Sequence, residues 1–395
     1  MELSKLYFRF NPWWEDGLDA IGGYKNRKDF KRLLAKLNNK QVVLLTGLRR
    51  VGKTTLMRLL IKQLIELDKV KAIHCFYVSL DHYLLKDKSI LEIVEQYRTL
   101  HKIPSSQNVF LFLDEITFAK DYALQLKNLY DNEQVKIYAS SSSASLLKNE
   151  SAYLTGRNTL IEIMPLDFDE YLDFKDITIK QADAQLRESY FRDYLASGGI
   201  PEYVLTNDSS YLFDLVDNII YKDIAAINGI KQIDLLKDYF LLLMERAGKQ
   251  VSINKMSSVL GISTQTGKHY LELFAQTYLI HLVGRQGKLN EQLVSPKKAY
   301  ACDTGIRTAY TGKRDWGSVF ENYVFLKLKH LNLRYVKENG IELDFISENK
   351  TLVECKFHNE EMSKKQKALF DSHKAQAKYI IRSESQIDEL LNSQS

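Results

Sequence analysis

The chain has 395 residues, more than one ordinary core holds, so two or three domains are expected. Hydrophobic residues make up 45% and charged residues 27%, which excludes a long disordered or fibrous protein. The formal net charge of +5 is small for this length, so the chain as a whole lacks the composition of a general polyanion binder.

The cysteines and the N-terminal segment bear on the compartment. Cys75, Cys302 and Cys355 are widely spaced and match neither a CxxC nor a zinc-ligand pattern, so reduced and mostly buried thiols are expected. The N-terminal segment has charges where a signal peptide has its apolar core, and no run of about 18 apolar residues occurs. These features predict a soluble cytoplasmic protein that is not bound to a membrane.

Residues 1–170 are predicted to form the first domain. From residue 41 to 164, short β-rich runs alternate with longer helical patterns, which predicts a parallel α/β sheet. The expected strands are Gln41 to Leu45, Ala72 to Leu80, Val109 to Leu113, Val135 to Ala139 and Thr159 to Ile163.

A phosphate-binding motif follows the first expected strand. Residues 47–54 fit G-x-x-x-x-G-K-[ST] between an apolar strand and a helical run, the context this P-loop motif requires. The backbone N–H groups of such a loop surround the phosphates of ATP, and Lys53 neutralises the β and γ phosphates. The hydroxyl of Thr54 is expected to ligate Mg²⁺. The predicted nucleotide-binding residues are Gly47, Leu48, Arg49, Arg50, Val51, Gly52, Lys53, Thr54 and Thr55.

A second motif comes from the expected strand that begins at Val109. Its apolar residues end in Asp114 and Glu115, which is the pattern of a Walker B strand. Asp114 is expected to hold the Mg²⁺ shell and Glu115 to polarise the attacking water. A tight strand-to-helix bend and a strand ending in acids for solubility are the purely structural alternative. Their occurrence together in this order favours ATP binding and hydrolysis.

These motifs resemble a family of AAA-type ATPases of bacteria and archaea that carry a C-terminal nuclease-like domain of unknown function. The resemblance runs from Asn11-Pro12-Trp13-Trp14 through both motifs to the C-terminal region, so it covers most of the chain. In that family a strand ending in Thr-Gly-Ser supplies a sensor hydroxyl. This chain has Ala139-Ser140-Ser141-Ser142, so the resemblance implies Ser140 as the sensor, although Ser141 replaces the usual glycine.

Two further short motifs are similar to those of the family. Thr155-Gly156-Arg157 precedes a Pro-Leu-x-Phe-x-Glu-Tyr signature at residues 165–171. The resemblance implies that Arg157 is an arginine finger, which a neighbouring subunit of a homo-oligomer often supplies. A surface salt bridge is the alternative. Gly198 to Pro201 look like the element that related ATPases place against adenine, which implies a nucleotide contact at Pro201, whereas a turn after a helix is the plainer explanation.

The middle of the chain, residues 171–295, is predicted to be a helical lid with a winged-helix-like region. Up to about Leu282, Leu, Ile and Tyr recur at three- and four-residue spacing, which predicts an all-α region. Within it, a helix from Val251, a turn at Gly261 and a helix from Thr264 to Tyr278 predict a helix-turn-helix or winged helix, in agreement with the resemblance.

The functional interpretation of this region is DNA contact by the second helix. That helix carries Lys268, His269 and Glu272, which is little positive charge for reading phosphates. A scaffold that relays the nucleotide state or packs against a partner is therefore the alternative.

Residues 296–395 are predicted to form a small α/β domain of helix, three strands, helix and strand. This order resembles the PD-(D/E)xK nuclease core, and the resemblance places its acidic and lysine positions at Glu321, Asp344, Glu354 and Lys356. The carboxylates, Asp344 and Glu354 among them, would hold Mg²⁺ or Mn²⁺, and Lys356 would orient or deprotonate water. The alternative is a solvated ion pair beside an acid, in a fold that has lost its activity.

Two functions remain open from the sequence. The first is an oligomeric ATPase that couples nucleotide turnover to a nuclease-like domain acting on DNA or RNA. The second is an ATP-controlled switch or scaffold whose C-terminal domain is an inactive docking module. An intact Glu115 favours turnover over a switch that cannot hydrolyse ATP, and slow turnover would still serve a switch.

Overall fold

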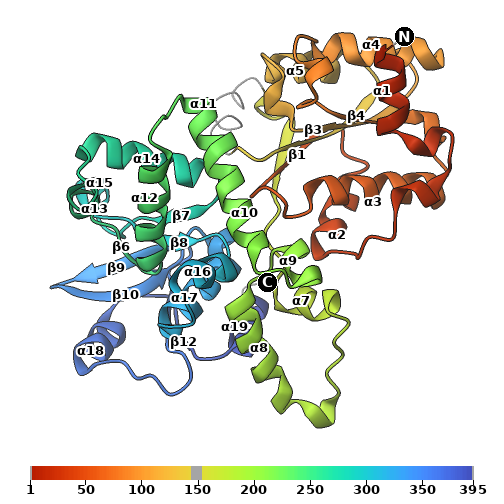
Figure 1. Cartoon of the computed structure of the whole chain (residues 1–395). Coiled ribbons are helices and arrows are strands. Elements are labelled where there is room, and N and C mark those ends of the chain that lie inside the picture. The colour runs from red at the N-terminus through yellow and green to blue at the C-terminus, as the bar shows by residue number, and fades with distance from the viewer. Residues whose placement is uncertain (1, 144–153, 394–395) are drawn as a thin grey trace. The chain divides into compact units, whose positions relative to one another are not determined.

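The computed structural model describes residues 2–143 and 154–393, which form two compact units, Met1–Met164 and Pro165–Ser395. Figure 1 shows both units coloured along the chain. The predicted further boundary near residue 295 remains a prediction.

The first unit is built on a parallel five-stranded sheet in the order β2-β3-β4-β1-β5. Its strands are β1 (Val42–Thr46), β2 (Cys75–Ser79), β3 (Val109–Asp114), β4 (Val135–Ser141) and β5 (Asn158–Glu162). Its helices are α1 (Glu2–Phe10), α2 (Lys28–Leu34), α3 (Lys53–Glu66), α4 (Ile90–His101) and α5 (Tyr122–Asn132). Each predicted strand therefore lies within a few residues of an observed one. The predicted run from Ala72 begins as a 3₁₀ turn and becomes extended only at Cys75.

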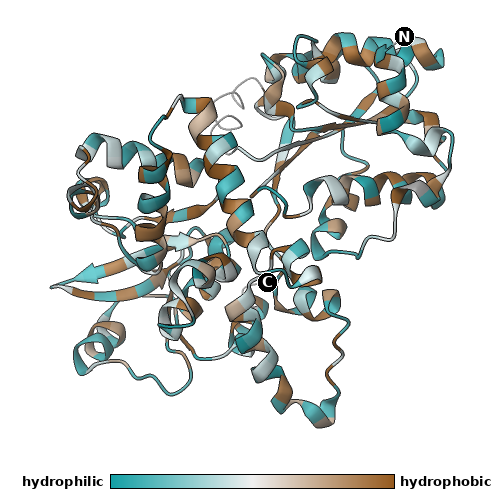
Figure 2. Cartoon of the chain, viewed as in Figure 1, coloured by the Kyte–Doolittle hydropathy of each residue, from teal (hydrophilic) through white to brown (hydrophobic). Residues whose placement is uncertain are grey.

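Both faces of this sheet are covered by helices, and its inner strand β1 is buried at every position (Figure 1). Val42 and Leu44 of β1 belong to the core beneath α1, α4 and α5. The intervening residues, Val43 and Leu45, point to the other face because side chains alternate along a strand. Figure 2 shows that the helices around the sheet carry both polar and apolar residues, as expected for helices with one buried side.

The N-terminal Asn-Pro-Trp-Trp segment protects the edge strand β2. The side chain of Asn11 accepts a hydrogen bond from Tyr77 N at 2.6 Å and donates one to Tyr77 O at 2.8 Å. The indole nitrogens of Trp13 and Trp14 each donate to Cys75 O at 3.1 Å. Side chains thus satisfy backbone groups that a neighbouring strand would otherwise pair.

The second unit begins with helices and contains two further sheets. Its helices are α7 (Phe168–Phe174), α8 (Gln185–Ser197), α9 (Pro201–Thr206), α10 (Ser210–Asn218), α11 (Ala226–Asn228), α12 (Ile233–Glu245), α13 (Ile253–Val259), α14 (Thr264–Gln276), α15 (Leu289–Val294), α16 (Thr304–Thr311), α17 (Trp316–Leu328), α18 (Lys364–Ser372) and α19 (Glu384–Ser393). A π-helical segment, Ile219–Ala225, joins α10 to α11.

The prediction of an all-α region up to Leu282 is wrong for two segments. Residues Lys249–Gln250 form β6 and Ile280–Val283 form β7, and both pair in an antiparallel manner with β8 (Lys298–Ala301). Strand β6 is too short to leave a periodic pattern, and the apolar run of β7 follows a helix directly. A short apolar run of this kind does not distinguish strand from helix by periodicity.

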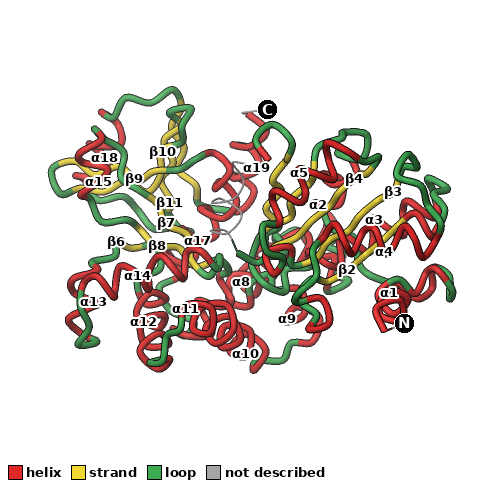
Figure 3. Tube along the Cα trace, turned by 90° about the horizontal axis from the view of Figure 1, so that it is seen from above, coloured by secondary structure: helices red, strands yellow, loops and turns green. Residues whose placement is uncertain are grey.

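The C-terminal part forms the second sheet of this unit, in the order β12-β11-β10-β9. Figure 3 labels β9, β10 and β11 of this sheet. Its strands are β9 (Arg334–Glu338), β10 (Ile341–Ile346), β11 (Thr351–Cys355) and β12 (Ala377–Ile381), with only β11 and β12 parallel. The predicted order of helix, three strands, helix and strand is the order observed from α17 to β12. Within the described residues, no helix has the length and apolar content needed to cross a membrane.

Candidate functional site: the P-loop and its acidic strand

The P-loop joins β1 to α3 and has the backbone geometry that its glycines allow. Gly47 and Gly52 have φ values of 132° and 99°, which side chains disfavour. A Cβ on Gly47 would lie 2.2 Å from the carbonyl oxygen of Ile163, so only glycine fits there. The loop therefore passes close to the chain beyond β5 and leads directly into the N-terminus of α3.

Lys53 is the first residue of α3 and is only 5% exposed. Its ammonium nitrogen donates to the carbonyl oxygens of Gly47 and Leu48, each at 2.9 Å. These bonds hold the buried charge inside the loop whose N–H groups and helix N-terminus suit phosphate oxygens. A positive group in this position suits the terminal phosphates of a nucleotide.

The carboxylate of Asp114 accepts hydrogen bonds from hydroxyl groups on three elements. Thr54 Oγ1 of α3 donates to Asp114 Oδ2 at 2.5 Å, and the Tyr77 hydroxyl of β2 donates to the same oxygen at 2.8 Å. The hydroxyl of Ser140 donates to Asp114 Oδ1. Because β4 lies between β1 and β3, Ser140 pairs with Leu45 and stands beside both motifs.

Glu115 follows directly and is held in an uncommon backbone conformation. Its φ is 50°, in the left-handed region that a non-glycine residue rarely adopts. Its N–H donates to Ser140 Oγ at 3.1 Å, and its Oε2 accepts from Ser142 N at 3.3 Å and Ser142 Oγ at 3.1 Å. Strain of this kind gathers at functional sites, where the surrounding contacts fix one side-chain direction.

The residues of the P-loop and of the acidic strand are suited to binding Mg²⁺ together with a nucleoside triphosphate. Thr54 and Asp114 offer a hydroxyl and a carboxylate oxygen in direct contact, and Mg²⁺ prefers oxygen ligands of this kind together with phosphate and water. Gly47 and Gly52, which carry no side chain, let the loop bend with positive φ values at its two ends. These residues would hold Mg²⁺ between the loop and the acidic strand.

Two residues at the site were missed from the sequence. Arg27 is buried and donates from Nη1 to Val51 O at 2.7 Å and from Nη2 to Met164 O at 2.9 Å, which fixes the P-loop backbone. Tyr77 donates to Asp114, and burial together with the charge of Asp114 raises the pKa of Tyr77, so it remains a donor. No local motif signals either residue, because each reaches the site only through tertiary packing.

Arg157 and the P-loop of the same chain lie at opposite ends of the strands of the sheet. It precedes β5, and its carbonyl oxygen accepts from Val42 N at 2.8 Å, where β1 begins. The P-loop follows the other end of β1, about 16 Å away for a strand of this length. The guanidinium pairs with Asp131 at 3.0 Å and lies 5.8 Å from the ring centre of Tyr130.

Pro201 is the first residue of α9 in the second unit. The preceding Gly199 donates its N–H to the buried Asp303 at 2.7 Å, and a Cβ on Gly199 would lie 2.0 Å from Leu166 O. Burial raises the pKa of Asp303 to about 6, although hydrogen bonds from backbone N–H groups oppose the shift. Close packing explains the glycine here, and the contact between Pro201 and adenine remains a prediction.

Comparisons with known proteins agree with the geometry of the first unit. Residues 39–172 match the family model described as AAA domain. This part of the chain is therefore similar to an AAA domain. The match supports nucleotide binding and hydrolysis by this domain. Residues 188–316 match a family model described as a domain of unknown function (DUF8612).

Similar proteins cover most of the chain. The uncharacterized protein MJ1544 of Methanocaldococcus jannaschii is 28% identical over 370 residues, which cover 88% of this chain and 82% of that protein. An uncharacterized protein of Haemophilus influenzae is 26% identical over 343 residues, 82% of this chain and 83% of its own. The solved S. cerevisiae Hsp104:casein complex in its extended conformation is 17% identical, covers 65% of this chain and 52% of that chain, and has a TM-score of 0.35. A likeness of that extent carries no argument about function.

The C-terminal acidic residues come together around a lysine that the sequence did not suggest. Lys298 of β8 is 1% exposed, and its ammonium lies 2.5 Å from Glu321 Oε1, 2.9 Å from Glu342 Oε1 and 3.6 Å from Asp344 Oδ1. Lys356 pairs with Glu354 Oε1 at 2.9 Å.

This cluster does not fit a divalent cation as it stands. Lys298 lies between the carboxylates that were predicted to hold Mg²⁺ or Mn²⁺, and it supplies the positive charge that burial of these acids demands. In the described part of the chain, no group of three His, Cys, Asp or Glu side chains is placed to hold a metal ion. Asp344 Oδ2 instead accepts from Cys355 N at 2.9 Å, and Glu354 Oε2 accepts from Asp344 N at 3.1 Å.

The pKa values of the acids and of Lys298 depend on the charges of their neighbours. Burial and the charge of Asp344 raise the pKa of Glu321 and of Glu354 above the usual range for a carboxyl group. Burial lowers the pKa of Lys298, but the facing charges, Glu321 first, outweigh burial and raise it well above its usual value. Lys298 therefore stays charged while the acids compete for protons.

Replacing Lys298 should destabilise the protein far more than replacing its neighbour. Lys298→Met leaves three partly buried carboxylates, those of Glu321, Glu342 and Asp344, without their cation, and we expect a loss of about 3 to 5 kcal/mol in the free energy of unfolding. Lys297→Met changes the adjacent exposed lysine and should stay within about 0.5 kcal/mol. Chemical denaturation of the full chain measures both.

The loss should also depend on pH with a definite sign. Where folding raises the pKa of a carboxyl group, the folded protein loses stability as pH rises through that pKa. The difference in unfolding free energy between the wild type and Lys298→Met should therefore shrink as pH falls from about 8 to about 5. Without nucleotide, millimolar Mg²⁺ or Mn²⁺ should leave the thermal midpoint of the wild type unchanged. Equal stability of the two variants, or a metal-induced rise in the wild type that Asp344→Ala abolishes, would contradict this account of the cluster.

Proposed function

We propose that the AAA domain binds Mg·ATP and hydrolyses it to ADP and phosphate. The observation that carries this proposal is the convergence on Asp114 of Thr54 and Ser140, with Glu115 held beside them. Thr54 comes from the P-loop helix, Asp114 from β3 and Ser140 from β4, so the packing of the sheet sets their positions. A structural bend alone would not require this set of oxygen atoms.

Each side chain has a role that follows from its contacts. Lys53 and the loop N–H groups bind the β and γ phosphates, and Thr54 and Asp114 hold Mg²⁺, which offsets charge on the phosphates. Glu115 accepts the proton of the water that attacks the γ-phosphorus. Ser140 bridges Asp114 and the backbone of Glu115, which suits a residue that positions the base relative to the metal shell.

Changing Lys53 and Glu115 should have effects of different kinds. Lys53→Ala removes the charge that faces the phosphates and should abolish tight ATP binding. Glu115→Gln keeps the shape but cannot accept a proton, so ATP should remain bound while turnover falls about 100-fold or more. Isothermal titration for binding and phosphate release for turnover separate the two. Wild-type turnover by Glu115→Gln would refute the assignment of the base.

We infer further that Arg157 acts as a finger on a neighbouring subunit of a homo-oligomer. Two observations support a role in trans. Arg157 lies at the end of the strands that is remote from its own P-loop, and its partly exposed guanidinium is held in position by Asp131. A residue so placed reaches a γ-phosphate only from another chain. The ion pair with Asp131 holds the guanidinium in place until a phosphate of a second site replaces that contact.

Hydrolysis per subunit should therefore rise with protein concentration, because the complete site forms only between subunits. Arg157→Ala should lower turnover by about 10³-fold without weakening ATP binding. Lys127→Ala is the matched control, since Lys127 also lies beside Asp131, at 3.7 Å, but carries no guanidinium. Concentration-independent turnover, or equal losses in both variants, would leave Arg157 as a surface ion pair.

For the second unit we propose a docking module that does not cut nucleic acid. The order α12, β6, α13, α14, β7 and β8 supports a winged-helix-like part, in which the segment between β7 and β8 is the wing. The element order after α17 supports a nuclease-like fold, but Lys298 occupies the place of the cation that cleavage would need. Cleavage of DNA or RNA in Mn²⁺ that is lost in Asp344→Ala would favour the nuclease hypothesis instead.

A further inference from the structure

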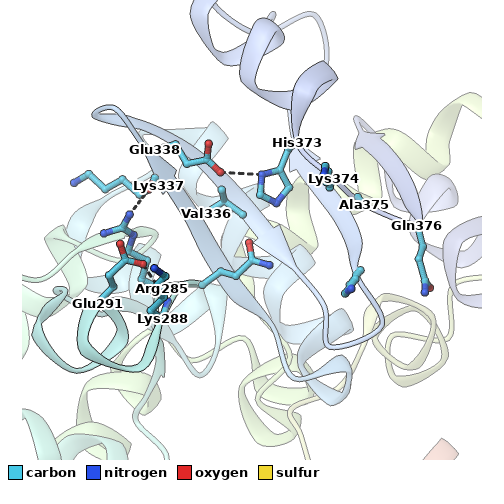
Figure 4. Close-up of a pocket in the computed structure, with 13 residues that line it drawn as sticks. Arg285, Lys288, Glu291, Val336, Lys337, Glu338, His373, Lys374, Ala375 and Gln376 are labelled. Atoms are coloured by element: carbon cyan, nitrogen blue, oxygen red, sulfur yellow. Dashed lines mark hydrogen bonds and ion pairs between the residues drawn. The ribbon is translucent and has the colours of Figure 1, made fainter.

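A basic groove lies in the second unit, apart from the carboxylate cluster. Its volume is about 800 Å³, and it is lined by the segment between β7 and α15 together with α15 itself, by β9, by the turn between β10 and β11, and by the residues after α18 (Figure 4). We call this surface the basic groove. The groove thus has the wing on one side and the sheet of the C-terminal part on the other.

The groove concentrates positive charge. It is lined by two carboxylates, Glu291 and Glu338, and by five cations, Arg285, Lys288, Lys337, Lys350 and Lys374. The resulting net charge of three is more than half of the +5 of the whole chain. Glu338 is already engaged, because its Oε1 lies 3.0 Å from His373 Nδ1 (Figure 4).

Several of these cations are available to a ligand. Lys288, Lys350 and Lys374 are exposed, and within the described residues neither Lys350 nor Lys374 has a side-chain hydrogen bond or ion pair. Arg285 uses Nη2 to donate to Lys337 O at 2.5 Å, while its Nε is buried without a hydrogen-bond partner among the described residues. Lys350 and Lys374 can therefore approach a ligand without giving up a contact with another side chain.

The backbone of both walls is fixed, so the charges are placed in advance. Gln286 N donates to Tyr335 O at 2.8 Å and Tyr335 N donates to Gly284 O at 3.0 Å, which binds the wing to the edge of β9. On the other wall, Gln376 N donates to Lys350 O at 2.9 Å. Less conformational freedom is then lost when a ligand binds.

We propose that the basic groove binds the phosphodiester backbone of a nucleic acid without reading its sequence. This inference rests on the proposed docking role of the second unit and names its partner. Lysines act as point charges toward phosphates and arginine as a forked donor, the combination found in backbone contacts. The second helix of the helix-turn-helix, α14, offers Lys268 opposed by Glu272 and is the poorer surface for this ligand.

An acidic peptide is the other polyanion to consider, and the structure disfavours it. Peptides that add to a sheet need an unpaired strand edge, but the segment around Arg285 already covers the edge of β9. The aliphatic surface of the groove is limited to side chains such as Val336 and Ala375, which offer no deep pocket for anchoring residues.

The test uses the full chain and labelled single-stranded DNA, duplex DNA and single-stranded RNA, with affinity measured by fluorescence anisotropy over a series of salt concentrations. Lys288→Ala/Lys374→Ala removes one exposed lysine from each wall. Lys255→Ala/Lys268→Ala is the matched control, since it removes two exposed lysines from α13 and α14. Equal denaturation midpoints establish that both double variants are folded.

We expect the groove variant to bind about tenfold more weakly, with the slope of log K against log salt reduced by about 1.8 for duplex or about 1.4 for a single strand. The control should keep the wild-type affinity and slope. No binding by the wild type, unchanged binding by the groove variant, or a loss confined to the control would each overturn the proposal. So would polyglutamate that competes as well as DNA at equal charge. ATP turnover measured in parallel reports separately on the AAA domain.

Discussion

The carboxylate of Asp114 is the point on which the first unit depends. It receives hydrogen bonds from Thr54, Tyr77 and Ser140, which lie on a helix and two strands that are distant in sequence. The strand order makes this possible, because β4 separates β1 from β3 and brings Ser140 beside both motifs. A charged group buried in this way is stable only with several donors, so the same contacts that satisfy it also define the geometry of the proposed nucleotide site.

The second unit also depends on one charged side chain, but here the central group is positive and the groups around it are negative. Lys298 on β8 contacts Glu321 on α17 and acids on β10, so one buried ammonium ties the three-stranded sheet of β6, β7 and β8 to the sheet that follows. The lysine satisfies charges that a metal ion would otherwise satisfy. Strand β8 also pairs with β7, and the segment that follows β7 is hydrogen-bonded to Tyr335 of β9, so one wall of the basic groove has a defined backbone.

The sequence predicted best where a structure is determined locally. The P-loop, the acidic strand and the C-terminal element order of helix, three strands, helix and strand all follow from contiguous patterns in the sequence. The parallel sheet of the first unit follows from the alternation of β-rich and helical runs. Tyr77, Arg27 and Lys298 could not be predicted, because each is placed by contacts with residues far away in the chain. The clustering of Glu321, Asp344 and Glu354 was foreseen, but not the buried lysine that changes its chemistry.

The most direct test of the account is calorimetric titration of ATP into the wild type and Asp114→Asn, with Mg²⁺ and with a chelator. Asparagine keeps the size of the side chain but removes the charge that should hold the metal. The account predicts that Mg²⁺ tightens ATP binding by the wild type about tenfold or more and has little effect on the variant, since a carboxylate ligand is lost. An equal gain from Mg²⁺ in both proteins would contradict the central role of Asp114.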